Sequence, residues 1–263
     1  MTLTAAEQAN RNFLRNLDIP DAPRTALFAV DGVDDAVQPV FDAAKQQAVV
    51  VGADVVSFAP TVEPEFRQAI TDSALVAQLA ADARIDQKQD PIAWFDAYFA
   101  VLGGLGWTTQ VRDTAEYRFA QDGLEVHEAI LEVVTAFLGP IPGAAALVQL
   151  TLKSLKSMNS DSPWITLFNK KSEHADTGRF QFTLIRRGEG KELLADAMCF
   201  GLNAEKKVTQ ILFFKVHKNR ARLRRSLATV SIGEDALEGL RPLLKQKIEA
   251  HRKAFVLDLP LAI

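Results

Sequence analysis

The sequence predicts an α+β fold in which an antiparallel sheet of about four to six strands is covered by apolar helices. Helical spacing of apolar residues dominates residues 1–160, strand-like alternation joined by short turns fills residues 178–232, and a last helical stripe covers residues 234–254. Helices first, strands next and a helix last indicate α+β rather than α/β. The chain has 263 residues, so we expect the three parts to form a single domain, residues 1–263.

The first half of the chain contains most of the predicted helices. Pro64 and the pair Asp90-Pro91 are helix-start signals, and Gly103-Gly104 is a stop signal. The β-branched run at residues 48–58 predicts a strand that breaks at Gly52. The expected helices cover residues 5–16, 64–83, 91–103, 124–138 and 144–155, and a further strand covers residues 107–119.

The helix pair over residues 124–155 is unusually apolar. Between Ala129 and Leu150 the only charged residue is Glu132. Helices that are apolar on all sides are buried or meet lipid. The pair is therefore either a core hairpin or a segment that enters a bilayer, where Glu132 would cost about 2.5–3.5 kcal/mol to insert.

The second half of the chain predicts an antiparallel meander followed by a helix. Alternating apolar residues and short connections indicate four neighbouring antiparallel strands. These strands are expected over Arg179–Arg187, Glu192–Asn203, Lys207–Lys218 and Ala221–Ile232. The final helix carries an apolar stripe and contains Pro242, which should kink it or shift its start.

Composition narrows the classes of function. The net charge is −3 and charged residues make up 24% of the chain, which favours neither nucleic acid nor an acidic polymer as a partner. The N-terminus resembles no signal peptide. The single cysteine allows no intrachain disulfide. We therefore expect a protein that is cytoplasmic as made, then delivered to a host or associated with membranes.

The single cysteine, Cys199, belongs to a predicted strand face made of small side chains. Its neighbours on that face are Ala195, Ala197 and Gly201. Such a face either lets a helix approach closely or leaves a groove. An empty groove costs about 24 cal/mol per Å³, and a bound apolar ligand would remove that cost. In the second interpretation Cys199 opens into an apolar chamber and carries a fatty acyl chain as a thioester. Nothing near it in sequence would activate it for nucleophilic catalysis.

A basic cluster follows this strand. It crosses the expected turn between Lys218 and Ala221, in a window without acidic residues between Lys206 and Gly233. One interpretation is a sheet edge protected by charge; the other is a patch for anionic lipid headgroups. The cluster consists of Lys215, Lys218, Arg220, Arg222, Arg224 and Arg225.

Two stretches of the chain resemble a known family. They run from Trp94 through Gln110, and from Ala195 through Ala204 to Gln210–Lys215. In residue pattern and order, these stretches resemble the bacterial virulence factors typified by the Erwinia virulence factor (Evf). The resemblance implies an α/β fold, a cysteine that carries a palmitoyl thioester, and a role at membranes. In this chain, Cys199 would correspond to the cysteine that carries the thioester.

These patterns favour a non-enzymatic effector of the virulence type that acts at membranes and holds a fatty acyl chain. Its expected partners are that chain and a membrane surface, with no nucleic acid. We expect no metal and no cofactor beyond a covalent palmitate, since the sequence contains no phosphate loop, nucleophile elbow or metal-ligand spacing. Two alternatives stay open: an enzyme that hydrolyses or transfers lipids or acyl thioesters, and a protein-interaction module with a plain packed core.

Overall fold

The computed structural model describes residues 4–21, 41–42, 46–85, 91–117, 123–174, 177–205, 207–216, 221–259 and 261. Its helices are α1 (Ala5–Asn16), α2 (Pro64–Arg84), α3 (Pro91–Gly104), α4 (Val126–Leu138), α5 (Ala144–Ser157), α6 (Pro163–Ser172), the 3₁₀ turn η3 (Ile211–Phe213) and α7 (Glu234–Phe255). Its strands are β1 (Gln47–Val51), β2 (Asp54–Phe58), β3 (Thr108–Tyr117), β4 (Leu124–Glu125), β5 (Glu173–His174), β6 (Thr177–Arg187), β7 (Glu192–Ala204), β8 (Lys215–Val216), β9 (Ala221–Gly233) and β10 (Val256–Leu259).

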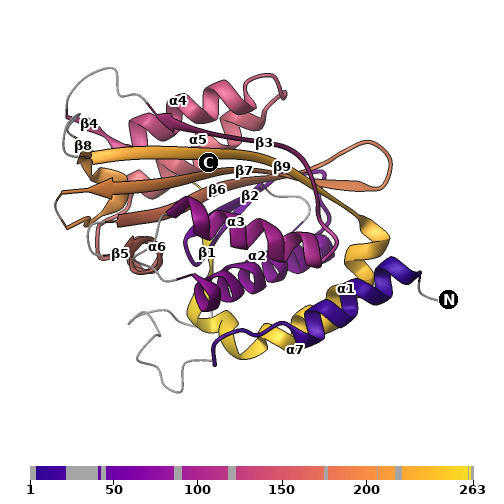
Figure 1. The fold of residues 1–263 in the computed structure, drawn as a ribbon. Coiled ribbons are helices and arrows are strands. Elements are labelled where there is room, and N and C mark those ends of the chain that lie inside the picture. Colours follow the sequence, from indigo (N-terminus) through magenta and orange to yellow (C-terminus); the bar gives the residue numbers. More distant parts are fainter. Residues whose placement is uncertain are drawn as a thin grey trace.

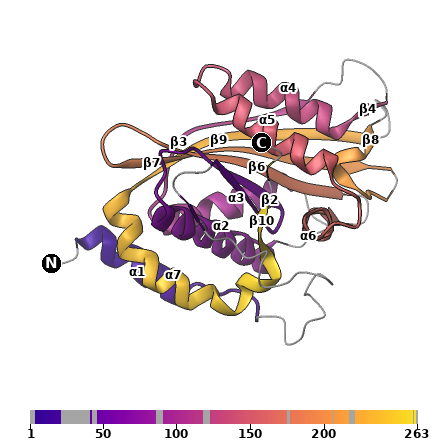
Figure 2. The ribbon, with the colours of Figure 1, turned by 180° about the vertical axis from the view of Figure 1, so that it is seen from behind.

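One large sheet organises the fold. Its strand order is β10-β1-β2-β6-β7-β9-β3, with β5 paired to β6, which makes eight strands. All neighbours are antiparallel except β2 and β6, which are parallel. Helices α2 and α3 cover one face, with α1 and α7 outside them, and α4 and α5 cover the other face (Figures 1 and 2). The α+β prediction is confirmed, with a sheet larger than the expected four to six strands.

The helical half follows its sequence signals closely. Helix α3 begins at Pro91 and ends at Gly104, and the β-branched run divides into β1 and β2 at a two-residue turn. Gly52 adopts φ +57 in that turn, a conformation that favours glycine. The Gln78 side chain from α2 holds the turn by donating to the Val51 carbonyl (2.7 Å) and accepting from the Ala53 amide (3.1 Å).

The predicted strand over Lys207–Lys218 is wrong. Strands β7 and β9 pair with each other along their whole length, from Glu192↔Gly233 to Ala204↔Ala221, so no strand lies between them. The described residues between them include η3 and the short β8, which pairs with β4 in a separate two-stranded sheet. Gln210 at φ 51 interrupts extended chain. A short apolar run such as Ile211–Phe214 is buried either way, so periodicity could not distinguish the two outcomes.

Two apolar clusters lie on opposite faces of the sheet. The cluster under α2 and α3 includes Ala195, Ala197 and Cys199, whereas the cluster under α4–α6 includes Met198 and Phe200. The alternation predicted for this strand is therefore confirmed, and β7 is buried on both sides because it lies near the middle of a helix-covered sheet.

Candidate functional site

A row of polar side chains crosses the sheet beneath α3. The strand registers place Asp54 of β2 opposite Gln181 of β6, Gln181 opposite Cys199 of β7, Cys199 opposite Ser226 of β9, and Ser226 opposite Thr114 of β3. Residues that lie opposite one another share a face of the sheet. Five neighbouring strands thus each contribute one polar or sulfur-bearing side chain to a single line across this face of the sheet.

Hydrogen bonds connect the buried end of this row. Gln181 donates from Nε2 to Asp54 Oδ2 (2.6 Å), and Thr183 donates from Oγ1 to Asp54 Oδ1 (3.0 Å). The Cys199 thiol donates to Gln181 Oε1 (3.6 Å). Gln181 Nε2 also lies 3.3 Å from the Tyr98 hydroxyl of α3. The amide of Gln181 therefore links the carboxyl group, the thiol and the covering helix.

The outer end of the row reaches the sheet edge. Ser226 accepts from Thr114 Oγ1 (3.0 Å) and from Arg112 Nε (3.2 Å). Arg112 also pairs with Asp96 of α3 (2.6 Å), and its guanidinium lies 4.8 Å from the centre of the Phe99 ring. These contacts join α3 to the edge strand.

Burial raises the pKa of both acidic groups of the row, the Asp54 carboxyl and the Cys199 thiol. It raises the pKa of Asp54 to about 7, against hydrogen bonds from Gln181 and Thr183 that favour the carboxylate. Burial also raises the pKa of the Cys199 thiol well above its ordinary value, and the nearby Asp54 raises it further. A thiol that remains protonated is a weak nucleophile. This geometry therefore does not favour Cys199 as a catalytic nucleophile.

The small-residue face differs from one end to the other. At one end Gly201 meets α3, where an added Cβ would lie 2.7 Å from Cβ of Pro91. Close helix packing thus explains the glycine. At the other end Ala195 lines a cavity of about 20 Å³, which has room for about one water molecule. Cys199 lies between these two ends, with no exposed surface.

The cavity has apolar walls and a few polar groups. Asp54, Thr183 and Tyr98 line it on the side of the polar row, and Ser73 lines it from α2. Trp107 lines it too, and its Nε1 atom is buried without a hydrogen-bond partner. The elongated apolar chamber that the sequence led us to expect is not open in this conformation, because α2 and α3 pack against the face.

Sequence reasoning found Cys199 and the small residues but missed the polar row. Asp54 interrupts the apolar run at residues 48–58, and Gln181 and Thr183 alternate with phenylalanines in β6. Polar residues inside otherwise apolar strands were the available signal. Their mutual contact depended on the parallel pairing of β2 with β6, which joins segments more than 120 residues apart.

The described residues of the basic cluster do not gather on one surface. Arg225 lies on the α4 side of β9 and pairs with Asp113 (3.2 Å). Arg222 and Arg224 alternate onto the α3 side, and Lys215 is exposed on β8. Lys218 and Arg220 lie outside the described residues.

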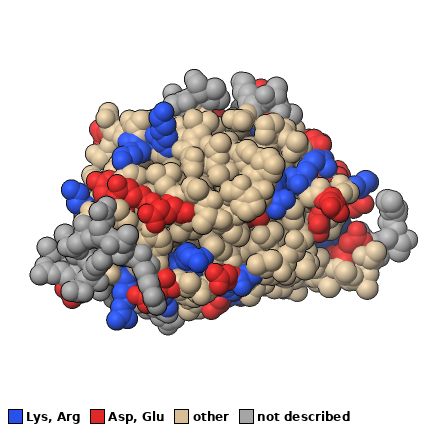
Figure 3. Space-filling view, turned by 90° about the horizontal axis from the view of Figure 1, so that it is seen from above, with Lys and Arg blue, Asp and Glu red and all other residues tan. Residues whose placement is uncertain are grey.

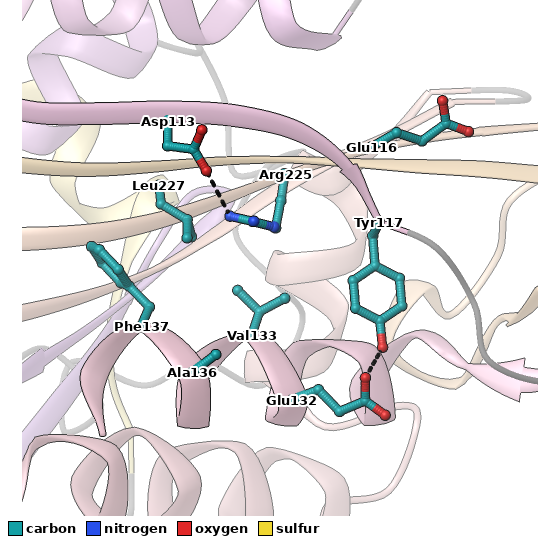
Figure 4. Close-up of a pocket in the computed structure, with 9 residues that line it drawn as sticks. All are labelled: Asp113, Glu116, Tyr117, Glu132, Val133, Ala136, Phe137, Arg225 and Leu227. Carbon is teal, nitrogen blue, oxygen red and sulfur yellow. Dashed lines mark hydrogen bonds and ion pairs between the residues drawn. The ribbon is translucent and has the colours of Figure 1, made fainter. Parts of the chain in front are cut away.

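A groove runs between α4 and the sheet edge formed by β3 and β9 (Figure 4). It has a volume of about 570 Å³. Its base is apolar, with Val133, Phe137 and Leu227, and the Asp113–Arg225 ion pair lies along one side. Tyr117 hydrogen bonds to Glu132 across the groove (Figure 4). Arg225, the basic residue in the lining of this groove, is therefore already paired within the chain.

The α4–α5 hairpin presents a weakly charged surface. No charged residue occurs between Glu132 and Lys153, and a broad area without charged side chains is visible from the α4–α5 side (Figure 3). The hairpin packs on the sheet through Ile130, Val134 and Leu147. None of the described helices has the length and apolar character needed to cross a membrane.

Comparison with known proteins gives few matches. No protein-family model matches the chain, and no curated protein matches it in sequence. A solved structure described as a delta-endotoxin has a TM-score of 0.44 at 13% identity, covering 77% of this chain and 90% of that one. Activated Cyt2Ba monomer from Bacillus thuringiensis subsp. israelensis has a TM-score of 0.33 at 15% identity, covering 66% of this chain and 95% of that one. Likeness at this level carries no argument about function, and neither structure is described as an Evf protein.

Proposed function

We propose that this protein is a non-enzymatic effector of the virulence type that acts at membranes and holds a fatty acyl chain, linked to Cys199 as a thioester, between its sheet and helices α2 and α3. The observation that carries the proposal is the placement of Cys199. It is fully buried on a central strand, between Ala197 and Gly201 on a face of small side chains, and a cavity borders that face at Ala195.

The surroundings of Cys199 suit storage of an acyl chain better than turnover. A long chain buries many methylene groups, each worth roughly 0.8 kcal/mol, and the walls beside the face are apolar, with Ile70, Ala74 and Leu102. An acyl thioester donor would transfer its acyl group to Sγ, and the donor thiol would leave with the proton. To make room for the chain, α3 would move away from the sheet and give up its contact with Gly201 through Pro91.

The intact mass of protein purified from its native host tests the acyl chain. We expect an added mass of one long-chain acyl group that is removed by neutral hydroxylamine. The Cys199→Ser variant should lack it, whereas Met198→Leu, which changes the adjacent residue on the opposite face, should retain it. Unmodified protein that turns over acyl-CoA would instead support an acyl-thioester enzyme. Unmodified protein without such activity would indicate an interaction module.

The membrane contact is a second part of the proposal. Arg222 and Arg224, which lie on the same side of β9, would meet anionic headgroups, at about 1 kcal/mol per basic residue near a charged surface. Binding to anionic vesicles should then fall steeply as salt rises, and the double variant Arg222→Glu/Arg224→Glu should bind more weakly. Arg241→Glu is the matched control, because Arg241 is a partly exposed arginine on α7. Vesicle binding that changes neither with salt concentration nor in the double variant would contradict this contact.

A further inference from the structure

The free edge of the large sheet is a long and accessible strand. β3 is the last strand in the sheet order and pairs only with β9 among the described strands. Seven of its ten side chains are exposed to solvent, and Val111 is 58% exposed, the one large apolar side chain so exposed in the described part of the chain. An exposed edge presents unpaired backbone N–H and C=O groups that another strand can pair with.

The central part of this edge has little of the usual protection against pairing. Natural edge strands are kept apart by lysine, proline, short length or bulges. β3 spans ten residues from Thr108 to Tyr117 and contains neither lysine nor proline. One irregularity falls between Thr109 and Val111, and the seven residues from Val111 to Tyr117 pair regularly with β9. The regular stretch is long enough to receive a partner strand.

The charges of β3 are arranged symmetrically about Thr114. Arg112 lies two residues before it and Glu116 two residues after it, and all three point to the α3 side of the sheet, opposite Ala228, Ser226 and Arg224. On the α4 side, Val111 and Tyr117 lie equally far from the same centre. Figure 4 shows Asp113 and Tyr117 directed toward the groove and Glu116 directed away from it.

We propose that two copies of this chain associate edge to edge through β3, antiparallel and with the twofold axis at Thr114. In this register Arg112 of each copy lies opposite Glu116 of the other, Val111 lies opposite Tyr117, and Thr114 lies opposite itself. Opposite-charge, aromatic–β-branched and Thr–Thr pairs are all favourable cross-strand pairs. A closed twofold contact of this kind joins the two sheets into one and leaves no β3 edge exposed.

Neighbouring registers are less favourable. A shift that moves the axis to Asp113 sets Asp113 opposite itself and Arg112 opposite Thr114. Like charges directly opposite one another are destabilising. The Glu116 side chain is exposed at this edge, so its carboxylate can reach the second copy. The charge pattern thus selects both the partner and the register.

Cysteine cross-linking tests the register directly. Under oxidising conditions the Thr114→Cys variant should form a covalent dimer in high yield, because directly opposed strand residues lie within disulfide distance. The native Cys199 is fully buried and does not compete. Thr109→Cys is the matched control: Thr109 is also exposed on β3, but its two copies would be separated by roughly 30 Å along the strands.

Sedimentation equilibrium tests the association and its charge pairs. The wild-type chain should be dimeric at about 100 μM, and Glu116→Arg should weaken the dimer by about tenfold or more. The double variant Arg112→Glu/Glu116→Arg should restore it, with thermal unfolding recorded to show that each variant is folded. A chain that stays monomeric, or a dimer in which Thr114→Cys cross-links no better than Thr109→Cys, would overturn the proposal.

Discussion

The two faces of the sheet have different chemistry although they share the same strands. On the α4–α6 side, four phenylalanine rings pack together, with Phe180 and Phe200 stacked at 5.2 Å between ring centres. On the α2–α3 side the same strands present Gln181, Thr183 and Cys199. The alternation of a β-strand produces this division. The aromatic face therefore supplies close packing, whereas the other face carries polar side chains and the thiol.

The aromatic face should show the largest loss of stability. Phe182 is fully buried between Phe168 and Phe180, so Phe182→Ala should lower the free energy of unfolding by about 3–5 kcal/mol. Thr183→Ala alters the next residue on the opposite face and removes the hydroxyl that donates to Asp54 and accepts from Gln181, at about 1–2 kcal/mol. Urea unfolding measures both. Equal losses would show that the two faces do not differ in packing.

Asp54 should make stability depend on pH. Because burial raises its pKa to about 7, the folded protein keeps a proton that the unfolded chain releases near pH 4. The contribution of Asp54 to stability should therefore be greatest below pH about 4, fall as pH rises to about 7, and stay level above it. The fall is at most on the order of 4 kcal/mol, at 1.36 kcal/mol per pKa unit.

The Asp54→Asn variant tests this dependence. It keeps the shape of the side chain but cannot ionise, so its free energy of unfolding should lack most of the fall between pH 4 and 7. Urea unfolding across this pH range measures the effect, with Asp113→Asn on the exposed edge strand as the control. If Asp54→Asn keeps the wild-type slope, the carboxyl group is ionised in the folded protein.

The closely packed end of the small-residue face should resist added volume. Gly201→Ala would place its Cβ 2.7 Å from Cβ of Pro91, so α3 must shift at a cost of about 1–3 kcal/mol. The midpoint of thermal unfolding measures the loss. A neutral result would mean that α3 moves freely from the sheet at this end.

The cavity end of the same face should tolerate added volume. Ala195 borders the cavity of about 20 Å³, so Ala195→Val should change stability by less than about 1.5 kcal/mol. The same thermal measurement compares it with Gly201→Ala. If Ala195→Val is the more damaging of the two, the cavity does not accept side-chain atoms. In acylated protein the valine should also reduce the yield of the thioester.

Much of the fold could be predicted from local sequence signals. Helices α1, α3 and α5 begin and end within a few residues of their predicted bounds, because caps, prolines, glycines and apolar spacing act within one or two turns. The lengths of β6 and β7 followed from alternation for the same reason. The strand predicted over residues 207–218 was wrong because four consecutive apolar residues suit a buried strand and a buried turn equally well.

The sequence by itself determined the helices, the two opposite faces of β7 and the position of Cys199 among small residues, since each depends on neighbours a few positions away. Only the tertiary structure decided the strand order, which pairs β2 with β6 and β7 with β9. That order brings Asp54, Gln181, Cys199 and Ser226 into one row. It also leaves β3 as a free edge. Strand partners depend on which distant segments bury the most surface together, and this is a property of the whole chain rather than of any short stretch.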